Sequence, residues 1–236
     1  MKRCMTTLLV LAFGIVLFST CAQPGDRAAP PQTSSLIDVV ARGQSQLVAV
    51  SFDRYATGTQ ELPIGVLDSG IGGLTVLAAI LQLDAFDNAT HRPGPDGRPD
   101  FEDERFLYLG DQANMPYGDY PSEGKTDFLQ ELILRDIVFL LGERYWLSTA
   151  APAPRHDKPP VKAIVIACNT ATAYGLEAVT AALQKWRLPV PVIGVIDVGA
   201  GGALRAIAAH DGRSAVAVLA TVGTCQSEGY PRALAR

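Results

Sequence analysis

The sequence predicts an α/β fold in which a doubly wound, mostly parallel sheet is covered by helices on both faces. Five short apolar runs have the composition of buried strands, and longer stretches with helical patterning alternate with them. The predicted strands are 64–67, 106–109, 163–167, 192–196 and 215–220, and the predicted helices are 74–83, 127–145, 171–186 and 200–209. Apolar strands joined by crossover helices are typical of parallel sheets that are buried on both faces.

The composition is that of an ordinary globular protein with one or two domains. The chain has 236 residues, of which 48% are hydrophobic and 19% charged, and its formal net charge is -4. Lysine and arginine are scattered, with no basic stripe interleaved with aromatic residues. We therefore expect no nucleic-acid partner, and acidic or neutral small molecules remain open.

The N-terminus has the layout of a secretory signal. Lys2 and Arg3 precede an apolar run, 8–18, that is too short to span a bilayer as a helix. The run ends in Leu-Phe-Ser-Thr-Cys at 17–21, which resembles the lipobox of bacterial lipoproteins, although two of its positions are atypical. A plain cleaved signal and an uncleaved anchor remain open. We expect a cell-envelope protein on the periplasmic side, secreted or lipid-anchored to the membrane through Cys21, and a cytoplasmic one if the signal is not used.

Four segments follow from these patterns. They are a signal peptide at 1–21, a tether with an N-terminal extension of uncertain structure at 22–62, a first α/β domain at 63–210, and the start of a second α/β domain at 211–236. The tether begins with a stretch rich in Pro, Ala, Gln and Ser. Two long interruptions, 84–104 and 148–160, are typical of surface insertions.

Polar and glycine residues follow three of the predicted strands. The first strand leads into 68–73, the second into 110–111 and then 116–118, and the third into 168–170. Ligands of open α/β sheets bind beyond the carboxyl ends of the strands, where helix N-termini receive anions. A glycine-rich turn commonly only makes a corner, and this one does not complete the G-x-G-x-x-G spacing. Polar and glycine residues at the ends of three strands together nevertheless predict a small-molecule site.

Cys168 is the reactive candidate at this edge. A free cysteine is most often a small buried hydrophobic residue. Here it follows a strand and precedes a helix, and the positive end of the helix dipole lowers a thiol pKa. Asn169 and Thr170 beside it offer polar groups that bind a carboxylate or cap the helix, and the sequence leaves both roles open.

Five motifs, in order, resemble those of the glutamate racemases in the aspartate/glutamate racemase family. They lie at 64–76, at 108–111 with 116–118, at 166–173, at 191–196, and at 220–224 with Ser227 and Tyr230. The third contains Ile-Ala-Cys-Asn-Thr-Ala-Thr-Ala and resembles the block that carries the first catalytic cysteine of that family.

The resemblance implies an amino-acid racemase that needs no cofactor, neither pyridoxal phosphate nor a metal. Two cysteines would face opposite sides of the α-carbon of glutamate or aspartate, one removing a proton and the other delivering one. It implies that Cys168 is catalytic, and that the residues which contact the substrate or orient the thiol are Asp68, Ser69, Tyr117, Gly118, Asn169 and Thr170. It further implies a role in supplying D-glutamate for peptidoglycan, and a possible homodimer.

The chain departs from the family pattern at its end. The second cysteine of the family lies in a Gly-Cys-Thr-His block, and no such block precedes Arg236. Cys225 is the other thiol after the signal, but it lies in a different motif. His91, His156 and His210 lie outside the motifs, and we expect them on the surface. We therefore expect a C-terminally truncated chain whose lone Cys168 exchanges a proton on one face.

Two alternatives remain open at this point. The chain could be an inactive racemase-like protein that binds acidic amino acids at the cell envelope, or a related isomerase of small carboxylates. The choice between glutamate and aspartate also stays open, because residues beyond these motifs contribute to side-chain recognition.

Overall fold

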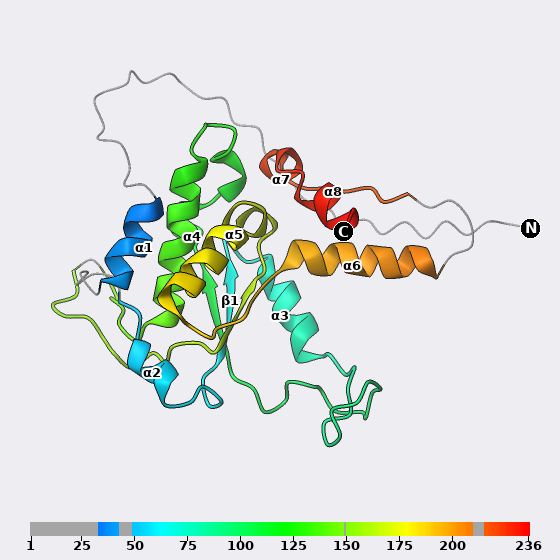
Figure 1. Ribbon diagram of the computed structural model, residues 1–236, viewed down its shortest axis with the longest axis horizontal. Coiled ribbons are helices and arrows are strands. Elements are labelled where there is room, and N and C mark those ends of the chain that lie inside the picture. Colours follow the sequence, from blue (N-terminus) through cyan, green and yellow to red (C-terminus); the bar gives the residue numbers. More distant parts are fainter. Residues whose placement is uncertain (1–32, 43–48, 149, 210–214) are drawn as a thin grey trace, which may run out of the picture.

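A four-stranded parallel sheet forms the centre of the molecule (Figure 1). The computed structural model describes residues 33–42, 49–148, 150–209 and 215–236. The strands are β1 (Ile64–Asp68), β2 (Phe106–Gly110), β3 (Ala163–Ile166) and β4 (Val192–Gly194), in the spatial order β2-β1-β3-β4. The parallel α/β fold predicted from the apolar runs is therefore confirmed.

Burial explains why β1 takes the inner position. All five of its residues are buried, and its middle residue, Val66, pairs with Tyr108 on one side and Val165 on the other. A strand that is apolar on both faces fits only where helices cover both sides of the sheet. The β2 strand, at one edge, is only half-buried along its length.

The main helices lie close to the predicted ones. They are α3 (Gly73–Leu81), α4 (Thr126–Leu141), α5 (Asn169–Trp186) and α6 (Val195–Ala208). Among the shorter elements, α1 (Thr33–Ala41) packs against α4 and α5. Three more are α2 (Phe52–Ala56) and the 3-10 helices η1 (Gln112–Asn114) and η2 (Tyr117–Asp119). The α4 and α5 helices lie along each other, and α3 is set apart from this group (Figure 1).

A close approach between α4 and α5 fixes the main core. A side-chain carbon added at Gly175 would lie 2.8 Å from Ile133, so only glycine lets the two helices meet here. Around this contact, Leu129, Ile137 and Val179 are fully buried. The core thereby fixes the start of α5, the helix that follows Cys168.

Two predicted strand segments are wrong. Residues 195–196 form the first turn of α6, because Ile196 packs with Ala200, four residues later, on one buried helical face. Residues 215–220 join no strand of the described part of the chain, and Val216 and Leu219 remain exposed. An apolar run becomes a strand only where a neighbouring backbone completes its hydrogen bonds.

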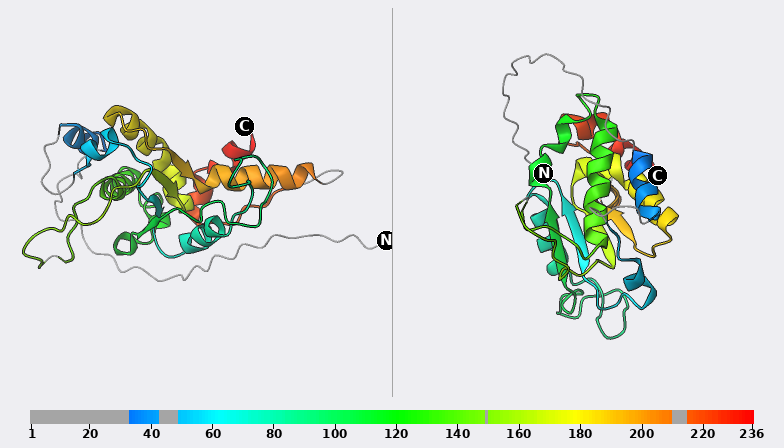
Figure 2. Two further views of the ribbon diagram at one scale, coloured as in Figure 1. Left: turned by 90° about the horizontal axis from the view of Figure 1, so that it is seen from below. Right: turned by 90° about the vertical axis from the view of Figure 1, so that its left-hand side faces the viewer.

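The C-terminal helices pack on α6, on α5 and on the 3-10 helix η2. The short helices α7 (Val222–Gln226) and α8 (Gly229–Leu234) end the chain, α8 packing on α6 and α7 on η2 and α5. The turned views show α6 extending away from the sheet (Figure 2). This arrangement brings 221–230 next to the start of α5.

The first long insertion, 84–104, is ordered by its own acidic side chains. Asp84 accepts hydrogen bonds from the backbone N–H groups of Asp96 and Gly97, and Asp100 accepts from those of Ala85 and Phe86. These aspartates therefore stabilise turns. In the part of the chain that the structure describes, no helix is both long and apolar enough to cross a membrane. The predicted signal and Cys21 lie outside the described residues.

Candidate active site

The topology has a switch point between β1 and β3. The chain leaves β1 for β2 on one side and later returns to β3 on the other, so the crossovers run in opposite directions at this point. Ligands of doubly wound sheets bind beyond the carboxyl ends of the two strands at such a switch. Asp68 ends β1, and Cys168 follows Ala167, whose N–H bonds to the carbonyl of Leu67.

Cys168 lies at this switch point and has polar contacts on one side. Its sulfur is 3.4 Å from the hydroxyl of Ser69, and it accepts a hydrogen bond of the same length from the N–H of Ala171. The cysteine thus caps α5 itself, in place of Asn169 or Thr170. It is 8% exposed, so one side faces the hydrophobic core and the other a hydroxyl group.

Burial decides the ionisation of this thiol. Removal from water raises the pKa of Cys168, while the hydrogen bonds from Ser69 and from the Ala171 N–H act in the opposite direction, and the charge of Asp68 raises the pKa further. The predicted lowering by the helix N-terminus is therefore outweighed, because desolvation penalises the thiolate more than two hydrogen bonds favour it. The protonated thiol is the resting form.

Asp68 is held rigidly beside the thiol. Its Oδ2 accepts hydrogen bonds from the N–H of Gly73, at 2.8 Å, and from the hydroxyl of Tyr108, at 3.1 Å. The Tyr108 hydroxyl also lies 3.0 Å from the carbonyl of Gly70. Burial and the nearby Asp68 raise the pKa of Tyr108 to about 12, so the phenol stays a donor. Tyr108 was not among the predicted site residues, although its position two residues before the end of β2 indicates that it lies near the site.

The turn after β1 packs directly on the end of β2. A side-chain carbon at Gly110 would lie 2.5 Å from the carbonyl oxygen of Gly70, so this position requires glycine. The N–H of Asp111 then bonds to the carbonyl of Asp68 at 2.9 Å. The two strand ends are therefore locked together, and the loop that follows β2 starts within the site.

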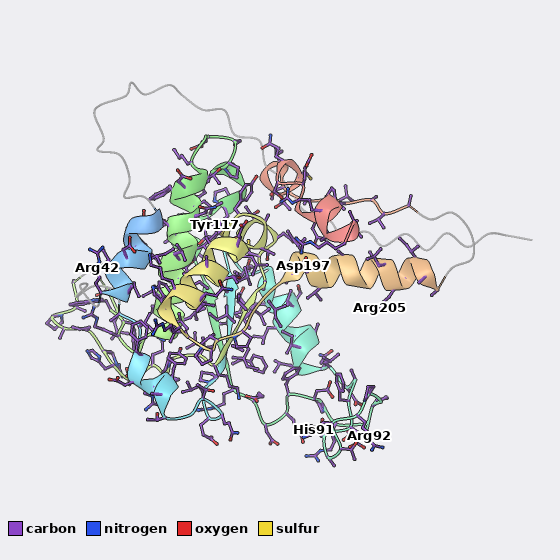
Figure 3. The ribbon with its side chains drawn as sticks, in the orientation of Figure 1. Arg42, His91, Arg92, Tyr117, Asp197 and Arg205 are labelled. Atoms are coloured by element: carbon purple, nitrogen blue, oxygen red, sulfur yellow. The ribbon has the colours of Figure 1, made fainter. Side chains whose placement is uncertain are left out.

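Tyr117 has a fully buried side chain. It is 1% exposed, and its hydroxyl lies 2.7 Å from Asp111 and 2.9 Å from Asp136 on α4. Burial, with the charges of these two aspartates, strongly raises the pKa of the phenol. Figure 3 labels Tyr117 beside α4. Substrate contact by its phenol, one way to interpret the family motif, therefore has no support in this geometry.

Three threonine hydroxyls join the start of α5 to α7. Thr170 lies 2.9 Å from Thr224 and 3.4 Å from Thr221, whose hydroxyl is 3.0 Å from that of Thr224. A side-chain carbon at Gly118 would meet Thr221 at 3.0 Å, so the loop after β2 also reaches this cluster. Asn169 is exposed and accepts a hydrogen bond from Tyr230 at 2.7 Å. The structure thus adds two threonines to the predicted site.

The remaining candidates lie elsewhere. Cys225 is exposed, and its thiol contacts the carbonyl of Ala220. His91 and His156 are exposed, His91 in the insertion next to α3 (Figure 3), and His210 lies outside the described residues. Within the described ranges, no group of three or more His, Cys, Asp or Glu side chains could hold a metal ion.

Comparison with known proteins finds glutamate racemases among the relatives of this chain. A glutamate racemase of Pediococcus pentosaceus is 36% identical over 173 residues, which are 73% of this chain and 48% of the relative. The family model described as Asp/Glu/Hydantoin racemase matches residues 144–236. The chain therefore carries a domain of the aspartate/glutamate racemase family. Another family member, the glutamate racemase of Shouchella clausii, is 38% identical over 172 residues.

A solved racemase has the same fold. The crystal structure of glutamate racemase isoform RacE1 from Bacillus anthracis superimposes with a TM-score of 0.52 at 32% identity, covering 74% of this chain and 48% of that one. The chain spans about half the length of the racemases it matches.

Proposed function

We propose that this chain provides the Cys168 side of a cofactor-independent amino-acid racemase, acting on glutamate or aspartate. The observation that carries the proposal is the position of the Cys168 sulfur, beyond the ends of β1 and β3, 3.4 Å from the hydroxyl of Ser69 and within electrostatic reach of Asp68. A hydroxyl and a carboxylate beside a thiol suit proton transfer. The names of the related racemases support the same reaction class.

The proposed step moves one proton. The thiolate of Cys168 forms an S–H bond with the α-proton of the amino acid, and the electrons of the broken C–H bond pass to the α-carbon and its carboxylate. The positive end of the α5 dipole favours the negative charge that develops there. Racemisation also needs an acid on the opposite face. By resemblance to the family, this acid is a second cysteine in a Gly-Cys-Thr-His block.

The pH dependence follows from the ionisation of Cys168. Burial raises the pKa of the thiol, so the thiolate is the minor form at neutral pH. Below that pKa, the thiolate fraction increases about tenfold for each pH unit, and proton abstraction should accelerate in parallel. The protonated resting form is suited to delivering a proton to the α-carbon.

Deuterium exchange tests this function. The purified full chain is incubated with L- or D-glutamate, and separately with aspartate, in deuterated water, and deuteration at the α-carbon is followed together with optical rotation. We expect exchange with retention of configuration. The substitution Cys168→Ala should reduce the rate by about 10²- to 10⁴-fold, the usual contribution of a general acid or base. Cys225→Ala is the matched control and should exchange at the wild-type rate.

The outcome also separates the alternative functions. No exchange with either amino acid would rule out the racemase proposal for this chain. Calorimetric binding of glutamate or aspartate without exchange would instead support an inactive binding protein. A difference between glutamate and aspartate in the exchange rate would identify the substrate.

We also propose that the protein acts at the cell envelope. The proposal is supported by the signal-like 8–18 run and by the lipobox-like sequence ending at Cys21. In a bacterial host supplied with radiolabelled palmitate, the full chain should become labelled and Cys21→Ser should not. Unlabelled wild-type protein in the soluble cytoplasmic fraction would contradict this location. The homodimer stays a prediction that sedimentation can test.

A further inference from the structure

The buried hydroxyl of Tyr117 lies between two carboxylates. It is 2.7 Å from Oδ2 of Asp111 and 2.9 Å from Oδ2 of Asp136. Asp111 comes from the end of β2, whereas Asp136 comes from the middle of α4, 25 positions later in the chain by residue number. Both distances are those of well-formed O–H···O hydrogen bonds.

A count of hydrogens favours protonation of one of the two carboxyl groups. A phenol carries a single hydrogen and can donate it to one acceptor in good geometry. Burial and the two aspartates raise the pKa of Tyr117, so the phenol keeps this hydrogen. If both carboxylates were ionised, one of the two contacts would join a charged acceptor to an oxygen with no hydrogen between them. Buried acceptors in that arrangement are strongly unfavourable.

Asp136 is the better site for the second proton. Asp111 is already an acceptor for the side-chain amide of Asn114, which lies 2.9 Å from each of its oxygens. Among the described residues, Tyr117 is the one hydrogen-bond partner of the Asp136 carboxyl. Burial raises the pKa of Asp136 to about 7, the charge of Asp111 adds to the effect, and the hydrogen bond with Tyr117 acts in the opposite direction. Desolvation favours the neutral form of a carboxyl group that has no cation beside it.

We propose that Asp136 is a positioning residue that, in its protonated form, donates to Tyr117 and thereby fixes the 111–119 loop at the end of β2. Tyr117 in turn donates to Asp111. The three side chains form one directed chain of hydrogen bonds from α4 to the end of β2. Chains of this kind strengthen each bond in them.

The loop connects this chain to the threonine cluster. Gly118, next to Tyr117, lies so close to Thr221 that a side-chain carbon would be 3.0 Å away. A side-chain carbon at Gly223 would meet the carbonyl of Gly118 at 2.6 Å. Thr221 contacts Thr170, two residues after Cys168. Any influence of Asp136 on Cys168 through this loop rests on the proposed function, whereas the proton shared by Asp136, Tyr117 and Asp111 does not.

Several of the other charged groups near α4 are in ion pairs. Those on the elements packed around Asp136 are Glu131 with Arg135 on α4, Asp38 on α1 with Lys185 on α5, and Glu177 on α5, while Tyr120 and Lys125 follow η2. Only Asp111 and Tyr117 act on the pKa of Asp136. A titration near neutral pH therefore belongs to this group of three.

The raised pKa of Asp136 determines the direction in which folding stability changes with pH. The folded-state pKa of Asp136 is raised above the value of an unfolded aspartate, so folding is favoured by this group at low pH and the benefit is lost as the pH rises to about 7. With a pKa of about 7, protonated molecules outnumber ionised ones about ten to one at pH 6, and the ratio is reversed at pH 8. The loop should loosen over the same interval.

Amide hydrogen exchange of the full chain tests the proposal, with rates corrected for the intrinsic effect of pH. In the wild type, exchange in 111–119 should accelerate by about tenfold between pH 6 and pH 8, in step with the loss of the proton. Asp136→Asn keeps a permanent donor, so its loop should stay protected at both values. Asp136→Ala should be unprotected at both, and Asp103→Asn, a change at an exposed aspartate, should behave as the wild type. If Asp136→Asn loses protection at both values, as Asp136→Ala does, the proposal is overturned.

A direct titration guards against misfolding of the alanine variant. With aspartate labelled by ¹³C at the carboxyl carbon, the wild type should show a carboxyl that titrates near neutral pH, and Asp136→Asn should lack it. Absence of that signal from the wild type, or its persistence in the asparagine variant, would overturn the proposal. Loss of deuterium exchange at the substrate, with the carboxyl signal intact, would count against the proposed function alone.

Discussion

Ser69 and Cys168 come from the ends of two neighbouring strands and meet at a sulfur to oxygen distance of 3.4 Å. The contact opposes the effect of burial, which raises the thiol pKa. Asp68 also has fixed donors, since the Tyr108 hydroxyl and the Gly73 N–H both donate to the same carboxylate oxygen. At the residue scale, the site is thus a thiol and a carboxylate that each have fixed hydrogen-bond donors.

Removal of the Ser69 hydroxyl should make Cys168 less reactive. In Ser69→Ala, the thiolate loses a donor, so the thiol pKa should rise by about one unit, corresponding to ~1.4 kcal/mol. Alkylation of Cys168 by iodoacetamide, followed by peptide mass spectrometry across pH, should slow by about tenfold below that pKa. Ser122→Ala, at an exposed serine, is the control. An unchanged profile in Ser69→Ala would show that the contact has no influence on ionisation.

The elements meet through residues that leave no room for side chains. Gly110 at the end of β2 faces the carbonyl of Gly70, and Gly73 at the start of α3 faces Asp68 and Ala167. These approaches place the turn after β1 against both neighbouring strands. At the scale of elements, glycine positions define how closely the ends of β1, β2 and β3 approach one another.

The substitution Gly110→Ala should disturb this convergence. Its new carbon would lie 2.5 Å from the Gly70 carbonyl, so the backbone must shift, at a cost of about 1–3 kcal/mol in the free energy of unfolding. Urea denaturation measures the loss. Gly201→Ala, within α6, is the matched control, because its carbon meets only the end of Arg205 at 3.5 Å. The control should be neutral or more stable by up to ~1 kcal/mol, and equal destabilisation of both variants would contradict the argument.

The C-terminal helices connect to the sheet through few polar contacts. Thr170 and Thr224 share a hydrogen bond of 2.9 Å, Tyr174 donates to the carbonyl of Gly223 at 2.8 Å, and Tyr230 donates to Asn169. All three contacts involve the first two turns of α5. On the scale of the whole molecule, α7 and α8 are therefore coupled to the site next to Cys168.

The substitution Thr224→Val should weaken that coupling. It removes a hydroxyl from a side chain that is 2% exposed and leaves Thr170 with a single, longer contact to Thr221. The free energy of unfolding should fall by about 1–3 kcal/mol, and 221–234 should become more sensitive to limited proteolysis. Thr75→Val, at an exposed threonine in α3, should change neither. Unaltered proteolysis in Thr224→Val would show that the cluster does not hold α7.

Much of the sheet and part of the site could be predicted from local patterns. Buried parallel strands need continuous apolar runs, which made β1 to β3 recognisable, and residues after such strands lie at one edge of the sheet. Asp68, Ser69 and Cys168 were found in this way, and the structure brings them together. The 215–220 run failed because pairing with another strand is not a local property.

The sequence by itself determined the parallel α/β class, the strand-end location of Cys168, and the order of the racemase motifs, because these depend on residues adjacent in the chain. Only the tertiary structure decided the ionisation of the thiol, the inward position of Tyr117, and its contacts with Asp111 and Asp136. Burial and the meeting of charges from separate elements fix a pKa, and neither is encoded in any short segment.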